Sequence, residues 1–321
     1  MEKGTIYYSI IIPHKNIPNL LKRCIDSIPE RPDTEIIIVD DNSDNNIVDF
    51  QSFPGLKRNN CTCIFDKSNK GAGHARNLGI NQSKGIKILF ADADDFFNYC
   101  INDILNDYIN DKSDLIFFNA NSIDTNTYLQ TYNRAAHINH DINQYIKGQN
   151  PKALNSLRYN FGEPWSKIID KSLIINNHIY FDEIHSHNDT TFSYLIGHKA
   201  KLFKVDERAL YCVTVREGSI SVSLNNNEKK LIRIDVFARK EIYFKQNNIS
   251  EPVIIHWYQL AQFYLEDKTY FRKAVSILIH YNYTPQEIKK QLIRFLYRTT
   301  HSYIRVLYYY CKIYLSQPFI K

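Results

Sequence analysis

Three aspartates follow a run of apolar residues near position 90, and they constrain the fold more than any other feature of the sequence. The run Ile86–Phe90 is followed by Asp92, Asp94 and Asp95. Carboxylates beside a buried strand are costly unless a cation or hydrogen bonds offset their charge. Side chains two residues apart in a strand point the same way, so we expect Asp92 and Asp94 to share one face. The pattern predicts a site for Mg²⁺ or Mn²⁺ carrying substrate phosphates, because these cations prefer oxygen ligands. The alternative is a solvated Asp-rich turn or a helix cap.

A second acid pair follows another apolar strand upstream. The segment Glu35–Val39 is apolar after its first residue and leads into Asp40, Asp41 and Asn42. In open α/β sheets, ligands bind beyond the carboxyl ends of the strands. We therefore expect the two acid clusters to face one crevice at the edge of a single sheet.

The order of the neighbouring elements predicts an α/β fold. Ser9–Pro13 and Cys61–Phe65 are predicted to be strands, and Pro18–Ile28 has its apolar residues on one side of a helix. Gly71–Gly79 is predicted to be a loop that opens a helix carrying Arg76. Strands that alternate with helices in this way are typical of β-α-β units in a parallel sheet.

Four strings of the sequence, in this order, resemble those of family 2 glycosyltransferases. They are Ser9-Ile-Ile-Ile-Pro13, Val39-Asp-Asp-Asn-Ser43, Gly71-x-x-x-Ala-Arg-Asn-x-Gly79 and Phe90-Ala-Asp-Ala-Asp-Asp95. Each string alone is a weak signal, but the four together make a strong one over roughly the first two-thirds of the chain. The resemblance implies a GT-A, Rossmann-like domain that binds a nucleotide sugar, as in bacterial enzymes that build capsular and other surface polysaccharides.

The resemblance also implies a catalytic base. The family usually carries a Glu-Asp pair followed by x-x-Phe, and this sequence has Asn188-Asp189-Thr-Thr-Phe192. Asn188 therefore stands where Glu is usual, and Asp189 keeps the position of the base. Asp189 would take the proton of the acceptor hydroxyl as that oxygen attacks the anomeric carbon, which inverts the anomeric configuration. The alternative is that Asp189 only caps a helix.

Further donor-site residues follow from the resemblance. It implies Asp41 and Asp40 on the nucleotide base, Asp94 on a Mn²⁺ or Mg²⁺ ion, and Asp92 on the ribose or the metal. Binding of the nucleotide sugar is also expected of Pro13, Arg76, Trp165 and Arg216. The alternatives are a surface position for Arg76 and simple packing for Trp165.

The predicted function is that of an inverting, metal-dependent glycosyltransferase. It would move one sugar from a nucleoside-diphosphate sugar, with a UDP-sugar favoured, to a hydroxyl of a saccharide or lipid-linked acceptor. Two other classes stay open. A nucleotidyltransferase also uses acids and a metal, but it needs a basic triphosphate loop, and none is obvious in the sequence. A catalytically silent scaffold that binds nucleotide sugars is kept open by Asn188.

Length and charge predict two parts. The 321 residues allow one sizeable catalytic domain, expected at 1–225, and a helical, basic region at 226–321. Helices are expected at 232–246, 252–266, 269–281 and 285–315. From residue 228 onwards there are 16 Lys or Arg and seven Asp or Glu, a net charge of +9, while the total of +6 leaves −3 for the rest of the chain.

The last expected helix has a basic side. If 287–315 is one helix, then Arg294, Arg298, Arg305 and Lys312 lie within roughly 40° of one line beside an apolar stripe. Such a helix can lie on an anionic membrane surface. The alternative is an ordinary helix that packs its stripe on the protein. No nucleic acid is expected, since the first part is acidic and no motif for RNA or DNA is present.

The remaining features predict a protein of the cytoplasm, either soluble or peripheral on the inner face of the cytoplasmic membrane. No apolar stretch of about 18 residues suited to spanning a membrane is present, and the first residues lack the pattern of a signal peptide. The six cysteines are scattered without metal-site spacing, so we expect reduced thiols.

Overall fold

The computed structural model describes residues 4–130, 134–215 and 226–297 of the chain. By its internal contacts the chain divides into two compact units, Met1–Ser223 and Leu224–Lys321. The predicted boundary after residue 225 borders the segment 216–225, which lies outside the described residues.

An eight-stranded sheet forms the centre of the first unit. Its strands are β1 Tyr8–His14, β2 Thr34–Asp41, β3 Cys61–Asp66, β4 Lys87–Phe90, β5 Phe96–Phe97, β6 Leu115–Asp124, β7 Lys167–Asp170 and β8 Phe203–Val215, and they lie in the order β3-β2-β1-β4-β7-β6-β8-β5. β1 is parallel to β2 and β4, and β6 is parallel to β8, whereas β7 is antiparallel to both β4 and β6. The carboxyl ends of β1, β2, β4, β6 and β8 therefore meet at one edge, which places both acid clusters together.

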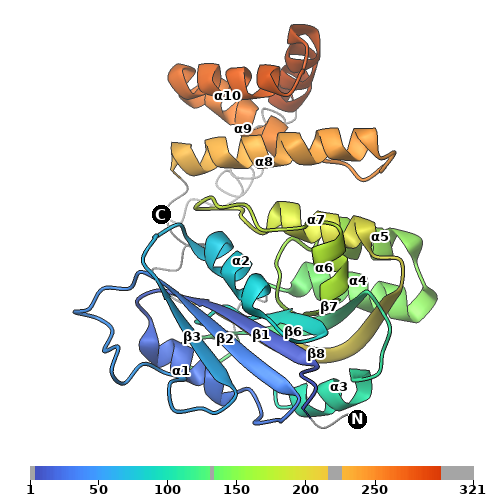
Figure 1. Cartoon of the computed structure of the whole chain (residues 1–321). Coiled ribbons are helices and arrows are strands. Elements are labelled where there is room, and N and C mark those ends of the chain that lie inside the picture. Colours follow the sequence, from blue (N-terminus) through green and yellow to red (C-terminus); the bar gives the residue numbers. More distant parts are fainter. Residues whose placement is uncertain (1–3, 131–133, 216–225, 298–321) are drawn as a thin grey trace, which may run out of the picture. The chain divides into compact units, whose positions relative to one another are not determined.

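Helices cover both faces of this sheet (Figure 1). They are α1 Pro18–Asp26, α2 Ala72–Gln82, α3 Ile101–Tyr108, α4 Ala136–Gly148, α5 Pro151–Asn160, α6 Lys171–Asn176 and α7 Thr190–Lys199. Because side chains alternate along β1, the two faces have different partners. The Tyr8 hydroxyl donates to the carbonyl of Leu105 in α3 (2.8 Å), whereas Ile11 lies against Gly79 of α2, where a Cβ would approach it to 2.4 Å. All of β1 is buried, as expected of a parallel strand covered on both sides.

The predicted fold class is confirmed, with one local correction at the acid cluster. β4 ends at Phe90, and its pairing with β1 closes with the bond from the Ala91 amide to the Ile11 carbonyl (3.1 Å). Residues 92–95 then form a turn, in which the Asp95 amide donates to the Asp92 carbonyl (3.0 Å). The expectation that Asp92 and Asp94 share a strand face is wrong, because the strand has already ended. Residues 92–95 are called the acid turn below.

The described part of the second unit is helical. It contains α8 Asn227–Gln246, α9 Ile255–Glu266, α10 Lys268–His280 and a further helical stretch at 285–297. α8 begins five residues before the predicted start, because the side chain of Asn226 accepts the amide of Lys229 (2.9 Å) and caps it. Residues 298–315 of the last predicted helix lie outside the described part of the chain.

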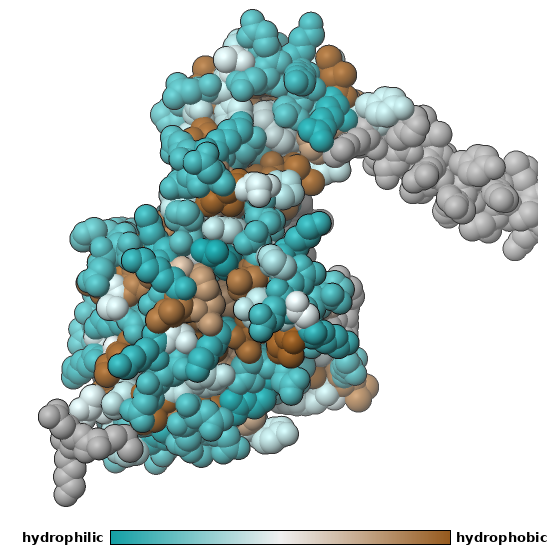
Figure 2. Space-filling model, turned by 90° about the vertical axis from the view of Figure 1, so that its right-hand side faces the viewer, coloured by the Kyte–Doolittle hydropathy of each residue, from teal (hydrophilic) through white to brown (hydrophobic). Residues whose placement is uncertain are grey.

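The second unit has its own apolar core. The core includes residues from all four helical stretches, namely Leu231, Ile234, Ala238, Trp257, Leu260, Ala261, Phe263, Ala274, Leu278, Ile288 and Phe295. Within the described residues, no helix is both long and apolar enough to span a membrane. On the face of the molecule in Figure 2, hydrophilic residues predominate and apolar ones are scattered among them.

Candidate active site

The acid turn is anchored by the most deeply buried of its three aspartates. Asp95 is 3% exposed, and its Oδ1 accepts the amide of Thr214 in β8 (2.7 Å). Burial raises the pKa of Asp95 well above its usual range, and the charges of Asp94 and Asp92 add to this effect. The Asp92 amide donates to the hydroxyl of Tyr211 (2.8 Å). Asp95 thus fixes the turn, while Asp92 and Asp94 remain partly exposed.

Arg76 connects the acid turn to the segment that precedes α7. It is 5% exposed, so the alternative of a surface arginine is wrong. One end of its guanidinium donates to Asp92 Oδ1 (2.6 Å) and the other to Asn188 Oδ1 (2.9 Å). The guanidinium also lies 5.2 Å from the ring centroid of Phe181. This bridge brings the acid turn and the segment 181–189 into one site, 16 and 112 residues from Arg76 along the chain.

The glycines of the α2 string let that helix approach its neighbours closely. A Cβ at Gly73 would lie 2.1 Å from the carbonyl oxygen of Asp182. Asn77 binds both backbone groups of Phe181, donating from Nδ2 to its carbonyl (3.0 Å) and accepting its amide at Oδ1 (2.9 Å). Sequence reasoning gave Asn77 no role, although its place directly after Arg76 in the string was a usable signal. Gly73 and Asn77 therefore hold the segment 181–189 against α2.

Asp189 stands at the N-cap position of α7 but does not cap it. Its backbone has α-helical angles (φ −90°, ψ −20°), and its side chain makes no capping hydrogen bond. The pKa of Asp189 is raised to about 6, chiefly by burial and further by Glu163 and Asp92, while Arg76 opposes the shift. A carboxylate with a pKa nearer neutrality is a better proton acceptor than an ordinary one. The capping alternative is therefore not realised.

The segment around Trp165 packs inside the unit. Trp165 is 3% exposed, and its ring stacks on Tyr211 with centroids 5.5 Å apart and planes at 11°. Lys167 is buried too, and its Nζ donates to the carbonyls of Phe161 (2.7 Å) and Glu163 (2.6 Å). Burial lowers the pKa of Lys167 to about 7. The packing alternative fits Trp165, because one face of its ring is covered by Tyr211.

The two acids at the end of β2 have different environments. Asp40 is fully buried, and it accepts hydrogen bonds from the amide (2.9 Å) and hydroxyl (2.5 Å) of Ser43 and contacts His14 Nδ1 at 2.7 Å. The expectation that Asp40 contacts the nucleotide base is therefore corrected, since no part of its side chain is exposed. Asp41 Oδ1 accepts the amide of Gly71 (3.1 Å), and its Oδ2 lies 3.4 Å from Lys15 Nζ.

A polar hollow of about 560 Å³ adjoins this end of β2. Its walls are formed by Asn16, Asn42, Ser43, Asp44, Asn45, Asn46 and Lys67. Asn16 and Asn42 both have positive φ (58° and 56°), a conformation that Asn tolerates better than most residues. Pro13 is buried in β1 opposite Val39 and borders this edge of the sheet.

The described residues fit a cation that is held only in part by protein. No group of three or more His, Cys, Asp or Glu side chains in the described ranges could enclose a metal ion by itself. Mg²⁺ usually binds through one or two carboxylates and completes its shell with water and substrate phosphates. Asp92 and Asp94 meet that requirement, since both are partly exposed and carry like charges in one short turn. Arg216 lies outside the described residues.

Comparisons with known proteins agree with this geometry. The family model described as "Glycosyl transferase family 2" matches residues 9–169. The glycosyltransferase GlyG of Streptococcus pneumoniae serotype 4 is 25% identical over 246 residues, which are 72% of this chain and 78% of that protein. A poly(ribitol-phosphate) beta-glucosyltransferase of Bacillus spizizenii is 38% identical over 93 residues, 27% of this chain and 15% of that protein.

A solved structure shows the same fold. TarS 1–349 of S. aureus, in complex with UDP-GlcNAc, superposes with a TM-score of 0.62 at 20% identity. The superposition covers 89% of this chain and 84% of the TarS chain. The predicted GT-A fold, with helices added after the α/β core, is therefore confirmed.

Proposed function

Because the chain belongs to glycosyl transferase family 2 and is thus a glycosyltransferase that uses nucleotide sugars, we propose a more specific reaction for it. It is an inverting, metal-dependent enzyme that moves one sugar from a UDP-sugar to a hydroxyl of a saccharide or lipid-linked acceptor in bacterial surface polysaccharide synthesis. The observation that carries this proposal is the Arg76 bridge, which joins the acid turn to the residue beside Asp189.

Asp189 is the catalytic base of the proposed reaction. Its carboxylate makes no capping bond and has a pKa raised to about 6, so it is mostly ionised near neutral pH while remaining a competent proton acceptor. It takes the proton of the acceptor hydroxyl while that oxygen attacks the anomeric carbon. A single displacement from the face opposite the leaving diphosphate inverts the configuration.

The donor is held at the carboxyl edge of the sheet. Asp41 contacts the nucleotide base, with Pro13 forming the floor of that site. Arg76 contributes through its fixed guanidinium, whose Nε is buried without a hydrogen-bond partner among the described residues. Arg216 is proposed as a phosphate contact and Trp165 as a support of the sugar site, acting through its packing on Tyr211.

Asp94 and Asp92 hold the cation, Mn²⁺ or Mg²⁺. When bound there, the cation neutralises negative charge on the departing diphosphate. Arg76 occupies one oxygen of Asp92 (2.6 Å) and so orients this carboxylate in the absence of donor.

The printed names of relatives support the donor and acceptor classes. The TarS structure contains UDP-GlcNAc, and the Bacillus spizizenii relative is named for glucosyl transfer to poly(ribitol phosphate). A nucleotidyltransferase is no longer an alternative, because the family model identifies a glycosyltransferase. The scaffold alternative rested on Asn188, yet the amide oxygen of Asn188 still accepts from Arg76 and so keeps the bridge intact.

Asp189→Asn tests the base. The variant should still bind UDP and UDP-GlcNAc as the wild type does, but transfer to acceptor should fall by about 10²–10⁴-fold. Asp103→Asn is the control, since it removes an exposed carboxylate from α3 and should leave turnover unchanged. Normal turnover in Asp189→Asn would rule out this base. A wild type that binds donor but turns over none would favour the scaffold.

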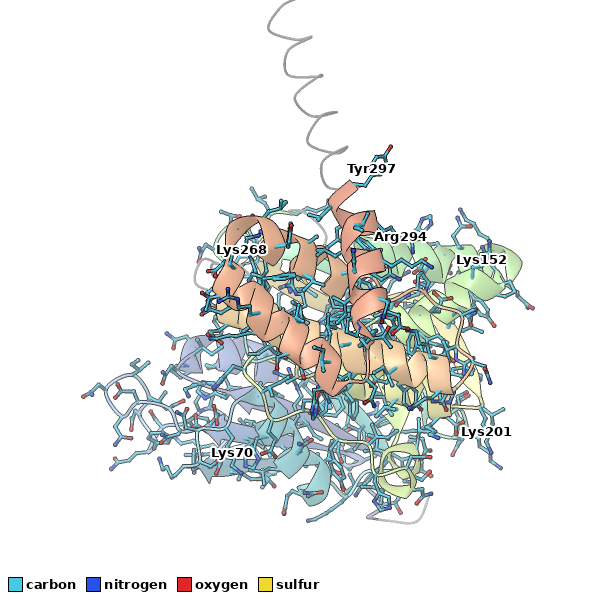
Figure 3. All side chains as sticks on the ribbon, turned by 90° about the horizontal axis from the view of Figure 1, so that it is seen from above. Lys70, Lys152, Lys201, Lys268, Arg294 and Tyr297 are labelled. Atoms are coloured by element: carbon cyan, nitrogen blue, oxygen red, sulfur yellow. The ribbon has the colours of Figure 1, made fainter. Side chains whose placement is uncertain are left out.

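The second unit attaches the enzyme to the inner face of the cytoplasmic membrane. On the helical stretch 285–297, Ile293 (57%) and Tyr297 (64%) are exposed beside the exposed Lys290 and Arg294. Figure 3 shows Arg294 and Tyr297 on the outer surface of this stretch. Residues spaced 290, 293, 294 and 297 share one helical face, and basic residues flanking apolar ones suit an anionic lipid surface.

Vesicle flotation tests this attachment. The wild type should float with vesicles containing phosphatidylserine, and Lys290→Glu/Arg294→Glu should float several-fold less, because each basic residue contributes about 1 kcal/mol near such a surface. Lys229→Glu/Lys273→Glu is the matched control, with the same charge change elsewhere on the unit. Equal flotation of the two double variants would argue against this face.

A further inference from the structure

The backbone of the acid turn is held from two directions at one atom. The carbonyl oxygen of Asp94 accepts from the hydroxyl of Thr214 (2.6 Å) and from a terminal nitrogen of Arg23 (2.5 Å). Both donors come from elements distant in sequence, β8 and α1, at separations of 120 and 71 residues. The side chain of Asp94 is expected to bind a cation, and its backbone carbonyl is held by the side chains of Thr214 and Arg23.

Arg23 is itself held in place. Its other terminal nitrogen donates to the hydroxyl of Thr125 (3.1 Å), and its guanidinium carbon lies 5.3 Å from the ring centroid of Phe96 and 5.8 Å from that of Tyr128. Its Nε is buried and has no hydrogen-bond partner within the described residues. Arg23 thus places a positive charge beneath the acid turn with little freedom to move.

Thr214 donates two hydrogen bonds to the acid turn. Its amide donates to the buried Oδ1 of Asp95 (2.7 Å), and its hydroxyl donates to the carbonyl of Asp94. It is 2% exposed, so these bonds are shielded from water. Thr214 also stands two residues before Arg216, the proposed phosphate contact.

We propose that Thr214 and Arg23 are positioning residues that set the orientation of the acid turn toward the cation and diphosphate. This inference rests on the proposed function. A metal site loses affinity when its ligands shift by a few tenths of an ångström, and removal of a supporting hydrogen bond typically costs 10–100-fold in metal affinity. Neither residue touches donor in this account, since each acts through the carbonyl of Asp94.

The test uses a matched pair at position 214. Thr214→Val has nearly the same shape but no hydroxyl, whereas Thr214→Ser keeps the hydroxyl; the Asp95 bond from the backbone survives in both. UDP binding is measured by calorimetry with and without Mn²⁺ on the full chain. Thr214→Val should weaken the Mn²⁺-dependent binding by about 10-fold or more and leave metal-free binding unchanged, and Thr214→Ser should stay within about two-fold of the wild type.

A second variant and a second readout keep the inference separate from the proposed function. Arg23→Met should weaken the same binding in the same direction, and hydrogen exchange at the amides of Asp92 and Asp95 should quicken in both Arg23→Met and Thr214→Val, with or without UDP. Unchanged exchange, or equal losses in Thr214→Val and Thr214→Ser, would overturn the inference. A wild type that fails to bind UDP would overturn the proposed function instead, and the exchange rates would then decide the inference alone.

Discussion

The two acid clusters look alike in sequence and differ in what their carboxylates do. At the end of β2, Asp40 is enclosed by His14 and Ser43, and Asp41, which is 5% exposed, accepts the amide of Gly71. In the acid turn, Asp95 is enclosed by β8, and Asp92 and Asp94 are left partly exposed. Both acids of the β2 cluster are therefore buried, whereas the acid turn has one buried anchor and two partly exposed acids. An acid beside a strand end can serve the fold, the ligand or both.

The two anchors also differ from each other. Burial by itself would raise the pKa of Asp40, but hydrogen bonds from His14 and Ser43 outweigh it and hold that pKa below its usual value. At Asp95, burial and the charges of the neighbouring aspartates outweigh its hydrogen bonds, so the pKa of Asp95 is raised. The fold thus favours the ionised form of Asp40 and the protonated form of Asp95, each relative to a free aspartate. The difference follows from the partners: Asp40 has a histidine and a hydroxyl, whereas Asp95 sits next to like charges.

Removal of the Asp40 carboxylate should have the largest effect on stability. Asp40→Ala leaves the Ser43 amide and His14 without their acceptor, so we expect a loss of about 3 kcal/mol in the free energy of unfolding. Asp41→Ala, the control at the neighbouring acid, removes the acceptor of one backbone amide, that of Gly71, and should lose about 1 kcal/mol. Urea denaturation followed by circular dichroism measures both. Equal losses would remove the distinction between Asp40 and Asp41.

The pH dependence of stability sharpens the contrast. Asp40 has a lowered pKa in the fold, so its contribution is present above about pH 4 and is lost as the pH falls below that value. Asp95 has a raised pKa, so its contribution is present at low pH and is lost as the pH rises. Asp95→Asn keeps a neutral acceptor, so its stability should gain on that of the wild type as the pH rises above about 4. A wild-type advantage that grows with pH would contradict the raised pKa of Asp95.

Asn188 offers a test with a smaller expected effect. Because it accepts a hydrogen bond from Arg76, the residue at this position affects how strongly the Arg76 charge lowers the pKa of Asp189. The groups that face Asp189 are Arg76, which lowers its pKa, Glu163 and Asp92, which raise it, and the buried Lys167. A glutamate at 188 would neutralise Arg76 and repel the ionised base. Asn188→Glu should therefore move the acid limb of the rate profile, expected near pH 6, upward by about half a unit to one unit. Asn188→Gln is the control, and identical profiles would separate Asn188 from the base.

The sequence predicted the strands β1 to β4 and the shared sheet edge, because apolar runs and strand-end acids are local signals, while the resemblance to family 2 glycosyltransferases indicated the segment that bears Asp189. β5 to β8 were not predicted. The sequence could not tell the buried acids from the partly exposed ones. Besides the nearby Ser43, Asp40 contacts His14, which is 26 residues away, and the partner of Asp95 is 119 residues away. The same limit applies to Arg23 and Thr214, whose roles depend on tertiary contacts. The predicted start of α8, residue 232, was five residues too late. The capping hydrogen bond of Asn226 stabilises the first turn, although the residues of that turn are mostly polar.

The most direct test of the account is the binding of UDP-GlcNAc, measured by calorimetry with and without Mn²⁺, to the wild type and to Asp94→Ala. The wild type should bind the donor at least about 10-fold more tightly with Mn²⁺, and Asp94→Ala should lose that gain while keeping the metal-free affinity. Asp40→Asn, if folded, should retain the gain, because Asp40 is an anchor. If the wild type and Asp94→Ala bind UDP-GlcNAc equally tightly with Mn²⁺, that result would contradict a metal site in the acid turn.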